Sequence, residues 1–383
     1  TGFAITGVKA YLNEEKKENA SLALLGELDA LRIPEHAYVN SETDAAHCCG
    51  HHAQMAGIFG AALALTVPEI AEKLGGQVVF FATPAEEYGE IEFKNQLREQ
   101  GKIRYGGGKC ELIRTGAFDD IDLCLAHHIQ PGDEIQVGSG TGNGFVSKVI
   151  RYLGKAAHAA GAPDKGVNAL SAASLGLQAL GLNRETFRDE DCVRVHPIIT
   201  KGGNLVNVIP DEIVIETLVR AKTIEAFTDA AKKTDRSFQA GAVAMGAKVE
   251  ITTLPGYLPT LAEQALPELK RAAELAAPEV PVREAAGHSG GSTDVGDVQH
   301  LMPVYTFNTG GVKGGLHQIN FEVTNEEEAY IDTAKMFALA AYGLLKEKAA
   351  RSKELVKNYK PVFKDSAEYT KFMEQFDSKE VLD

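Results

Sequence analysis

The chain has 383 residues, of which 44% are hydrophobic and 24% charged, and its formal net charge is −14. This length exceeds one typical core, so we expect two domains, and the acidic balance argues against nucleic acid or an anionic membrane surface as a partner. No apolar run approaches the ~20 residues that span a bilayer. The five cysteines are odd in number and irregularly spaced, which favours a reducing cytoplasm over a disulfide framework.

The first 142 residues have the pattern of an α/β domain. Apolar runs predict buried strands at residues 21–28, 77–82 and 123–128, and helices are predicted at residues 55–66 and 107–115. The charged segment 88–104 is interpreted as an irregular excursion or lid segment. Because open α/β sheets place their sites at the carboxyl ends of strands, the polar residues that follow these three strands predict a site there.

The pattern changes after a Gly-rich linker at residues 138–144. Between residues 145 and 253 the predicted order is β-α-β-β-α-β, which is that of a ferredoxin-like module. Helices and strands then alternate again. We therefore expect a catalytic α/β domain (residues 1–142 and 255–350) interrupted by an α+β domain (143–254) and followed by a helical tail (351–383).

A cluster of metal-binding residue types lies at residues 46–52, which read AHCCGHH. Cys49 and His51 are two positions apart, so in an extended segment both side chains face the same side. A thiolate and an imidazole aimed at one point can form half of a transition-metal site. A buried cysteine followed by a helix-capping histidine is the alternative interpretation of this pair alone.

Three other stretches carry further candidates: PAEE at residues 84–87, HHIQP at 127–131 and GLH at 315–317. In Glu86 and Glu87 the side chains diverge, so one carboxylate can bind metal while the other acts as a general base. A solvated acidic turn is the alternative. His127 and His128 also diverge, and spacing alone does not say which one faces the site. His317 follows glycines, which allow close backbone approach to a ligand.

This set of thiolate, imidazole and carboxylate groups suits Zn²⁺ or Mn²⁺ better than Mg²⁺ or Ca²⁺. Enough ligands are present for two ions that share a bridging water. Such a pair lowers the pKa of that water and polarises a carbonyl group, and the matching reaction is hydrolysis of an amide.

In this order the four clusters resemble the aminoacylase/carboxypeptidase family of di-metal peptidases, in particular its amidohydrolase branch with hippurate, auxin-conjugate and p-aminobenzoyl-glutamate hydrolases. HCCGH at residues 47–51 is similar to the family's HACGH, PAEE is unchanged, HIQP at 128–131 is similar to HxxP, and Leu316 and His317 match a late Leu-His pair. The resemblance implies that Glu86 activates water and then protonates the leaving amine. It implies five metal ligands: Cys49, His51, Glu87, His128 and His317.

The inserted module is similar to the lid domain of the same family, which implies an α/β di-metal peptidase fold with a ferredoxin-like lid and dimerisation domain. GKAAHAA at residues 154–160 is similar to the family's GGHAA segment, which implies that His158 stabilises the oxyanion, usually across a dimer. NVIP at 207–210 implies that Asn207 contacts substrate. Arg220 or Asn207 would hold a substrate carboxylate.

The chain departs from the family pattern at two places beside the expected site. His52 stands where an acidic residue or Asn usually follows the Cys-Gly-His motif, and residues 88–105 are inserted where relatives pass almost directly to a Gly-rich turn. These departures predict altered surroundings for His51 and an unusual substrate preference.

We therefore expect a cytoplasmic, homodimeric amidohydrolase with two divalent ions, zinc or manganese, in each subunit. Its substrate would be a small amide: an N-acyl or N-aroyl amino acid, such as a p-aminobenzoyl-glutamate-like compound, or a small dipeptide. Nucleic acid and membrane are not expected as partners. The alternatives are a non-catalytic binding or assembly protein on the same scaffold and a mono-metal enzyme that acts on another C–N bond.

Overall fold

The structure, a computed structural model, describes all residues 1–383, and these form two compact units. The first unit comprises Thr1–Thr141, Thr260–His288 and Asp294–Thr370. The second comprises Gly142–Pro259, Ser289–Thr293 and Lys371–Asp383. The second unit is therefore an insertion into the first, and the chain returns to it at the carboxyl terminus.

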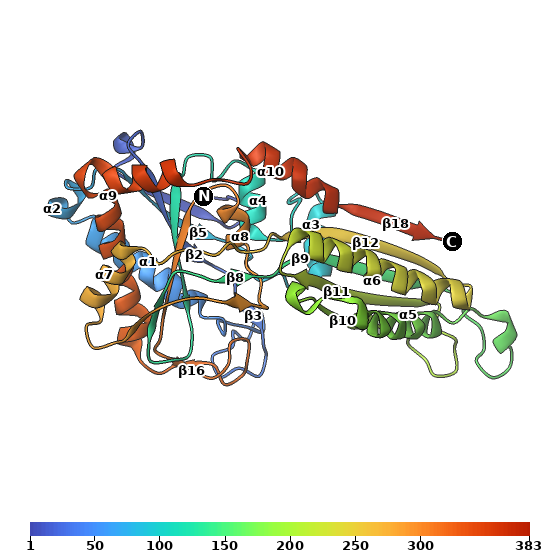
Figure 1. Cartoon of the computed structure of the whole chain (residues 1–383). Helices are drawn as coiled ribbons and strands as arrows, with labels where there is room; N and C mark the ends of the chain where they lie inside the picture. The colour runs from blue at the N-terminus through green and yellow to red at the C-terminus, as the bar shows by residue number, and fades with distance from the viewer. The chain divides into compact units, whose positions relative to one another are not determined.

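The first unit is built on a seven-stranded sheet in the order β1-β5-β2-β6-β15-β7-β13 (Figure 1). Strands β5, β2, β6 and β15 are parallel neighbours, while β1 runs antiparallel at one edge. All residues of β2 are buried, as expected for a parallel strand covered on both faces. The strands are β1 (Val8–Leu12), β2 (Ser21–Glu27), β5 (Gln77–Thr83), β6 (Leu123–Ile129), β7 (Ile135–Val137), β13 (Val282–Glu284) and β15 (Val304–Thr309).

Helices cover both faces of this sheet (Figure 1). On one face α1 packs against β2 and against α9, and α7 also packs on α9, so these elements enclose the main apolar core. On the other face α4 contacts α8. The helices are α1 (His51–Leu65), α2 (Pro68–Ala71), α3 (Ile91–Glu99), α4 (Gly108–Arg114), α7 (Pro267–Ala276), α8 (Val295–Gln299), α9 (Thr333–Asn358, with a non-helical break at residues 346–349) and α10 (Ser366–Met373).

Short ladders complete the first unit. Strand β3 (Leu31–Arg32) pairs with β4 (Ala45–Ala46), and β16 (Val312–Lys313) pairs with β17 (Glu322–Val323). Strands β8 (Thr141–Gly142) and β14 (His288–Ser289), where the chain passes from the first unit to the second, also pair. The segment 88–104, interpreted from the sequence as irregular, contains the helix α3.

The second unit has a five-stranded sheet in the order β10-β11-β9-β12-β18. Its first six elements follow the expected ferredoxin-like order. Residues of β11 alternate between buried and half-buried, because helices α5 and α6 cover one face of the sheet. The elements are β9 (Gly144–Leu153), α5 (Ala169–Asn183), β10 (Arg194–Lys201), β11 (Glu212–Ala221), α6 (Ile224–Met245), β12 (Lys248–Tyr257) and β18 (Ser378–Leu382).

The tail expected to be helical is helical only in part. Strand β18 pairs antiparallel with β12, from Val249 opposite Leu382 to Thr253 opposite Ser378. A strand of five residues, four of them exposed, carries too weak an apolar pattern to predict from sequence. No helix anywhere in the structure combines the length and the apolarity needed to cross a membrane.

Candidate metal centre and active site

The three strands predicted to end on functional residues are adjacent in the sheet. Strand β2 pairs in parallel with β5, where Glu27 lies opposite Thr83, and with β6, where Leu25 lies opposite Ala126. Their carboxyl ends therefore meet at one edge. The segments that follow them bring carboxylates and imidazoles together, as the topology of α/β sheets leads one to expect.

Gly50 aims Cys49 and His51 into this edge. It has a φ of 83°, and a Cβ there would meet Cγ2 of Ile129 at 2.0 Å, so only glycine fits. Helix α1 begins at the next residue, His51. Two other residues beside the edge also have left-handed backbone conformations, which are unfavourable for residues other than glycine. They are Ala85, with a φ of 55°, and His317, with a φ of 62°. Backbone strain of this kind clusters at functional sites.

All five predicted metal ligands converge at this edge, in two groups that share Cys49. Sγ of Cys49 lies 3.4 Å from Nε2 of His128 and 3.1 Å from Nε2 of His317. Nε2 of His317 lies 3.0 Å from Oε1 of Glu87. Within each group, Cys49–His51–His128 and Cys49–Glu87–His317, the ligand atoms all lie within 4.8 Å of one another.

The donor set of these two groups fits divalent transition ions. It combines a thiolate, imidazoles and a carboxylate, which are the ligands that zinc and similar ions prefer. Nε2 of His51 is buried and makes no hydrogen bond, although Oε2 of Glu27 lies 3.1 Å away. A buried imidazole nitrogen without a hydrogen-bond partner fits a metal-binding histidine.

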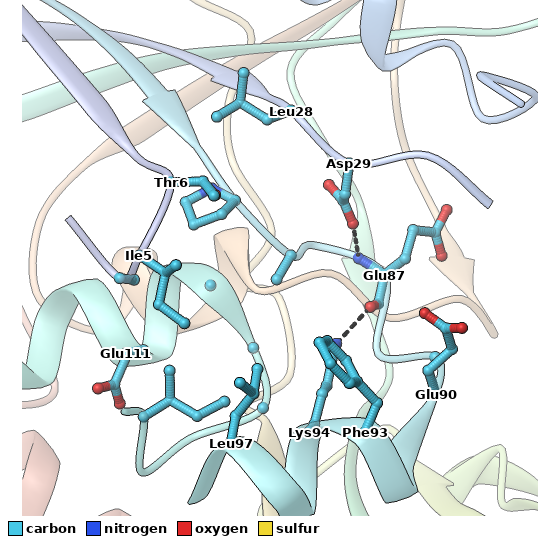
Figure 2. A pocket seen from close by; sticks show the side chains of 18 of the residues that line it. Ile5, Thr6, Leu28, Asp29, Glu87, Glu90, Phe93, Lys94, Leu97 and Glu111 are labelled. Carbon is cyan, nitrogen blue, oxygen red and sulfur yellow. Dashed lines mark hydrogen bonds between the residues drawn. The ribbon is translucent and has the colours of Figure 1, made fainter. Parts of the chain in front are cut away.

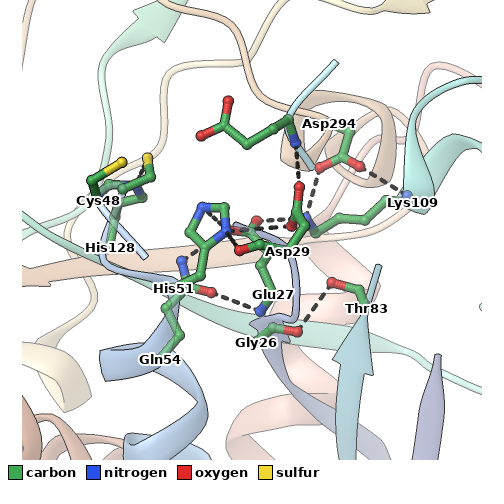
Figure 3. Close-up of polar contacts among 12 residues, drawn as sticks. Gly26, Glu27, Asp29, Cys48, His51, Gln54, Thr83, Lys109, His128 and Asp294 are labelled. Atoms are coloured by element: carbon green, nitrogen blue, oxygen red, sulfur yellow. Dashed lines mark hydrogen bonds and ion pairs between the residues drawn. The ribbon is translucent and has the colours of Figure 1, made fainter. Parts of the chain in front are cut away.

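Asp29 connects the two ligand groups. Its Oδ2 accepts a hydrogen bond of 2.7 Å from the backbone N of Glu87. Its Oδ1 lies 3.3 Å from Nδ1 of His51, and both residues are labelled in Figure 3. The backbone O of Asp29 lies 3.0 Å from the same Nδ1. A carboxylate behind a ligating histidine fixes the orientation of its ring. The sequence placed Asp29 at the end of a buried strand, but nothing in it assigned this supporting role.

A buried ion network lies behind these groups. Nζ of Lys109 lies 2.6 Å from Oε1 of Glu27 and 2.6 Å from Oδ1 of Asp294, and the backbone N of Lys109 donates to Oδ2 of Asp294 (Figure 3). Gln54 donates a hydrogen bond of 2.8 Å to Oε2 of Glu27. Burial alone would lower the pKa of Lys109, but the charges of Asp294 and Glu27 outweigh it and raise that pKa. The sequence did not single out Lys109 or Asp294 as site residues.

The environment of Glu86 suits a proton carrier. Burial, followed by the negative charges of Glu27 and Asp294, raises the pKa of Glu86 well above its usual range. A carboxyl group whose pKa lies closer to neutrality exchanges protons more readily during a reaction. The network around Lys109 therefore tunes the residue expected to act as the base.

The ligand groups hold protons when no cation balances them. Burial raises the pKa of the Cys49 thiol to about 12. Burial would lower the pKa of His51, but the charge of Glu27 and the hydrogen bond to Asp29 dominate and raise it to about 12. For Glu87, burial raises the pKa, but the hydrogen bond with His317 lowers it overall. A metal ion would take the place of the protons on Cys49 and His51.

Of the two adjacent histidines, His128 faces the candidate metal centre and His127 faces the core. Nε2 of His127 lies 2.8 Å from Oγ1 of Thr309, and its ring packs on Phe307 with centroids 4.9 Å apart. The alternation of side chains along β6 separates the two residues, since neighbours on a strand point to opposite faces.

His52 lies outside both ligand groups. Its ring lies 5.7 Å from that of His47 and packs edge-on against Phe321 and Tyr330. Burial lowers the pKa of His52 to about 4, so the imidazole is neutral at physiological pH. The departure from the family pattern thus replaces a polar neighbour of His51 with a neutral, partly buried ring.

Three predicted residues belong to the second unit. Nδ1 of His158 accepts hydrogen bonds from the backbone N of Ala160 and Gly161, at 3.2 and 3.0 Å, so its Nε2 carries the hydrogen in the neutral ring. His158 forms a backbone bridge with Val208, which places it beside Asn207. Arg220 lies on β11, its guanidinium 5.8 Å from the ring of Phe145.

Comparison with known proteins agrees with this geometry. Residues 23–342 match the model of Peptidase family M20/M25/M40. The human Xaa-Arg dipeptidase is 29% identical over 323 residues, covering 82% of this chain and 67% of that protein. The N-acetyl-L-cysteine deacetylase of Bacillus subtilis is 31% identical over 226 residues, covering 56% and 49%. One of the p-aminobenzoyl-glutamate hydrolase polypeptides of Escherichia coli is 30% identical over 207 residues, covering 52% and 39%.

Solved structures share the fold. A dinuclear metal-binding peptidase of the M20 family from Bacillus subtilis superposes with a TM-score of 0.59 at 23% identity, covering 89% of this chain and 85% of that one. An aminobenzoyl-glutamate utilization protein from Klebsiella pneumoniae gives a TM-score of 0.59 at 20% identity, covering 89% and 75%. The family match spans most of the chain. The chain therefore belongs to Peptidase family M20/M25/M40 and is a hydrolase that acts on amide or peptide bonds.

Proposed function

We propose that this protein is a metal-dependent amidohydrolase that cleaves an N-acyl or N-aroyl amino acid or a small dipeptide. The observation that carries the proposal is the pair of ligand groups that share Sγ of Cys49, each able to hold one divalent ion. The names of the relatives, a deacetylase, an aminobenzoyl-glutamate hydrolase and a dipeptidase, support this substrate class. The non-catalytic alternative would be favoured by lost ligands, and none of the five is lost.

In this mechanism two zinc or manganese ions, held by the five ligands, would polarise the substrate carbonyl and acidify the attacking water. Glu86 takes the proton from that water and passes it to the departing amine. Asp29 keeps the ring of His51 oriented, and Lys109 neutralises part of the negative charge behind Glu86. Nε2–H of His158 would donate to the developing oxyanion, and Asn207 or Arg220 would bind the substrate carboxylate.

The proposal includes a homodimer in which His158 acts on the site of the partner subunit. None of the five cysteines forms a disulfide, which fits a reducing compartment such as the cytoplasm. Sizing the protein in solution tests the homodimer directly, because a monomer with full activity would rule out action of His158 across subunits.

The deciding experiment compares Glu86→Gln with Cys49→Ala on a panel of N-acyl amino acids and dipeptides, with metal content measured for each protein. Glu86→Gln removes the proton carrier but none of the ligands, so it should lose turnover by at least about 100-fold and keep about two ions per chain. Cys49→Ala should lose both metal and turnover. An active Glu86→Gln protein contradicts the role of the base, and a single ion in the active protein favours the mono-metal alternative.

A further inference from the structure

A cavity of about 650 Å³ lies in the first unit between the amino-terminal residues, helix α3 and the segment that follows β5 (Figure 2). Its walls are predominantly apolar and include Ile5, Leu28, Leu31, Phe93, Leu97 and Ile103. Small-molecule sites in proteins typically have this size and an apolar lining with a few polar groups. Asp29 and Glu87 of the candidate metal centre also line it, but the proposed mechanism does not use the cavity itself.

Apolar side chains remain exposed where the cavity opens. Ile5 is 48% exposed and Phe93 is 55% exposed, although both line the cavity. Exposed apolar residues are ordinary when scattered, but two that face one hollow from different segments form a surface that an apolar ligand would remove from water.

Three charged groups of the lining, Lys94, Arg32 and Glu111, have partners within the protein. Nζ of Lys94 donates a hydrogen bond of 2.6 Å to the backbone O of Glu87 and lies 4.9 Å from the centre of the Tyr88 ring. Arg32 pairs with Asp44, and Glu111 binds Arg114. The two remaining lining charges outside the candidate metal centre, Glu90 and Lys102, are exposed and of opposite sign. The buried part of the lining therefore offers shape and apolar contact to an occupant, which fits an uncharged ligand better than a strongly charged one.

The cavity and the candidate metal centre share the chain segment around Glu87. In Figure 2 the carboxylate of Glu87 points away from the apolar side chains of the cavity, while its backbone is held by Asp29 on one side and Lys94 on the other. The cavity therefore lies behind the residue predicted to bind metal. Helix α3, which forms one wall, belongs to the segment 88–105 that departs from the family pattern.

We propose that this cavity binds an uncharged apolar acyl or aryl group. The group has two possible sources, which are the acyl part of the substrate itself and a separate apolar molecule. The first source rests on the proposed function, whereas the second does not.

Binding is tested with octanamide, a neutral probe, by calorimetry on the metal-loaded full-length protein. We expect saturable binding with one site per chain. Leu97→Asn and Phe93→Ala should each weaken this binding about tenfold or more, because each removes apolar contact from the ligand. Leu97→Met, which keeps volume and apolarity, should bind nearly as well as the parent protein. Phe59→Ala, at a 68% exposed position on α1 outside the cavity, should bind unchanged.

The source of the group is tested by hydrolysis of N-octanoylglycine and N-acetylglycine in the presence of octanamide. If the substrate supplies the group, octanamide competes with N-octanoylglycine, and Leu97→Asn raises KM for that substrate alone. If a separate molecule occupies the cavity, octanamide binds without competing with either substrate. The absence of octanamide binding, or binding that the Leu97→Asn and Phe93→Ala variants do not change, overturns the proposal. Absence of hydrolysis alone contradicts the proposed function and leaves the binding result standing.

Discussion

The ammonium group of Lys109 lies 2.6 Å from Oδ1 of Asp294, although 185 residues separate the two in the sequence. Glu27 approaches the same ammonium group at 2.6 Å from the other side, and all three side chains are almost fully buried. One cation thus balances two carboxylates in the core behind the candidate metal centre. Its removal would leave Asp294 without this counter-ion and Glu27 with only His51, whose Nε2 lies 3.1 Å away.

We expect Lys109→Met to lower the free energy of unfolding by about 3–5 kcal/mol, because breaking a buried ion pair leaves uncompensated charge. Urea denaturation followed by circular dichroism measures the change. Lys364→Met is the matched control, since the Lys364 side chain is 77% exposed and its ion pair with Asp365 is long, at 3.7 Å. Equal stability of the two variants would mean that the network contributes nothing to the fold.

The second prediction concerns Asp29, which touches both ligand groups without belonging to either. We expect Asp29→Ala to weaken metal binding about 10–100-fold, because loss of a partner behind a ligating histidine typically has this effect. Competition with a chromophoric chelator measures the affinity. Asp44→Ala removes a carboxylate that pairs only with the exposed Arg32, and it should leave the affinity unchanged. Parent-like affinity in the Asp29 variant would show that Asp29 does not support the site.

Metal binding should release protons. Without metal, the pKa of Cys49 and that of His51 are both raised to about 12, so both groups are protonated at neutral pH. A divalent ion requires a thiolate and a neutral imidazole, so binding displaces these protons and its affinity rises with pH, about tenfold per pH unit for each proton released.

Chelator competition between about pH 6 and 8 measures how the metal affinity changes with pH. A pH indicator in weak buffer measures the protons released on binding. The Cys49→Ala variant should release one proton fewer when it binds metal, and its metal affinity should therefore depend less steeply on pH. A pH-independent affinity would contradict the protonation of these ligands.

The fourth prediction concerns Gly50, whose φ of 83° and contact with Ile129 exclude a side chain. Gly50→Ala should lower the free energy of unfolding by about 1–3 kcal/mol and reduce the metal content, because strain there displaces Cys49 and His51. Gly181→Ala is the control. It lies in helix α5, where a Cβ would meet nothing within 4 Å, and alanine should stabilise the helix slightly. Normal metal content in the Gly50 variant would contradict its positioning role.

Much of the candidate site follows from local sequence pattern. Apolar runs fix β2, β5 and β6, and sheet topology then brings the residues after them to one edge, so Cys49, Glu87 and His128 meet as expected. The choice between His127 and His128 depended on the family resemblance, because alternation alone gives two faces without saying which is the core. In the structure the contact of His127 with Thr309 shows that His127 is the histidine that faces the core.

The sequence did not predict the features that depend on contacts between residues far apart in the chain. Lys109 lies in a short helix and Asp294 in a loop, and no periodicity relates positions so far apart. Helix α3 was not expected either, since its composition is strongly charged and it leaves only Ile91 fully buried. Weak amphipathic patterns of this kind do not distinguish a short helix from an irregular segment.

The carboxyl-terminal strand has a consequence for the association of this chain with others. Strand β18 covers the edge of β12, so β10 and β18 are the two outer strands of the second unit's sheet, and Ile198 and Ile199 are more than 40% exposed on β10. Deletion of residues 378–382 would make β12, a strand of ten residues, the outer strand in place of β18, which has five. Short outer strands limit edge-to-edge association, so the last strand leaves a shorter edge for another chain to pair with than β12 would.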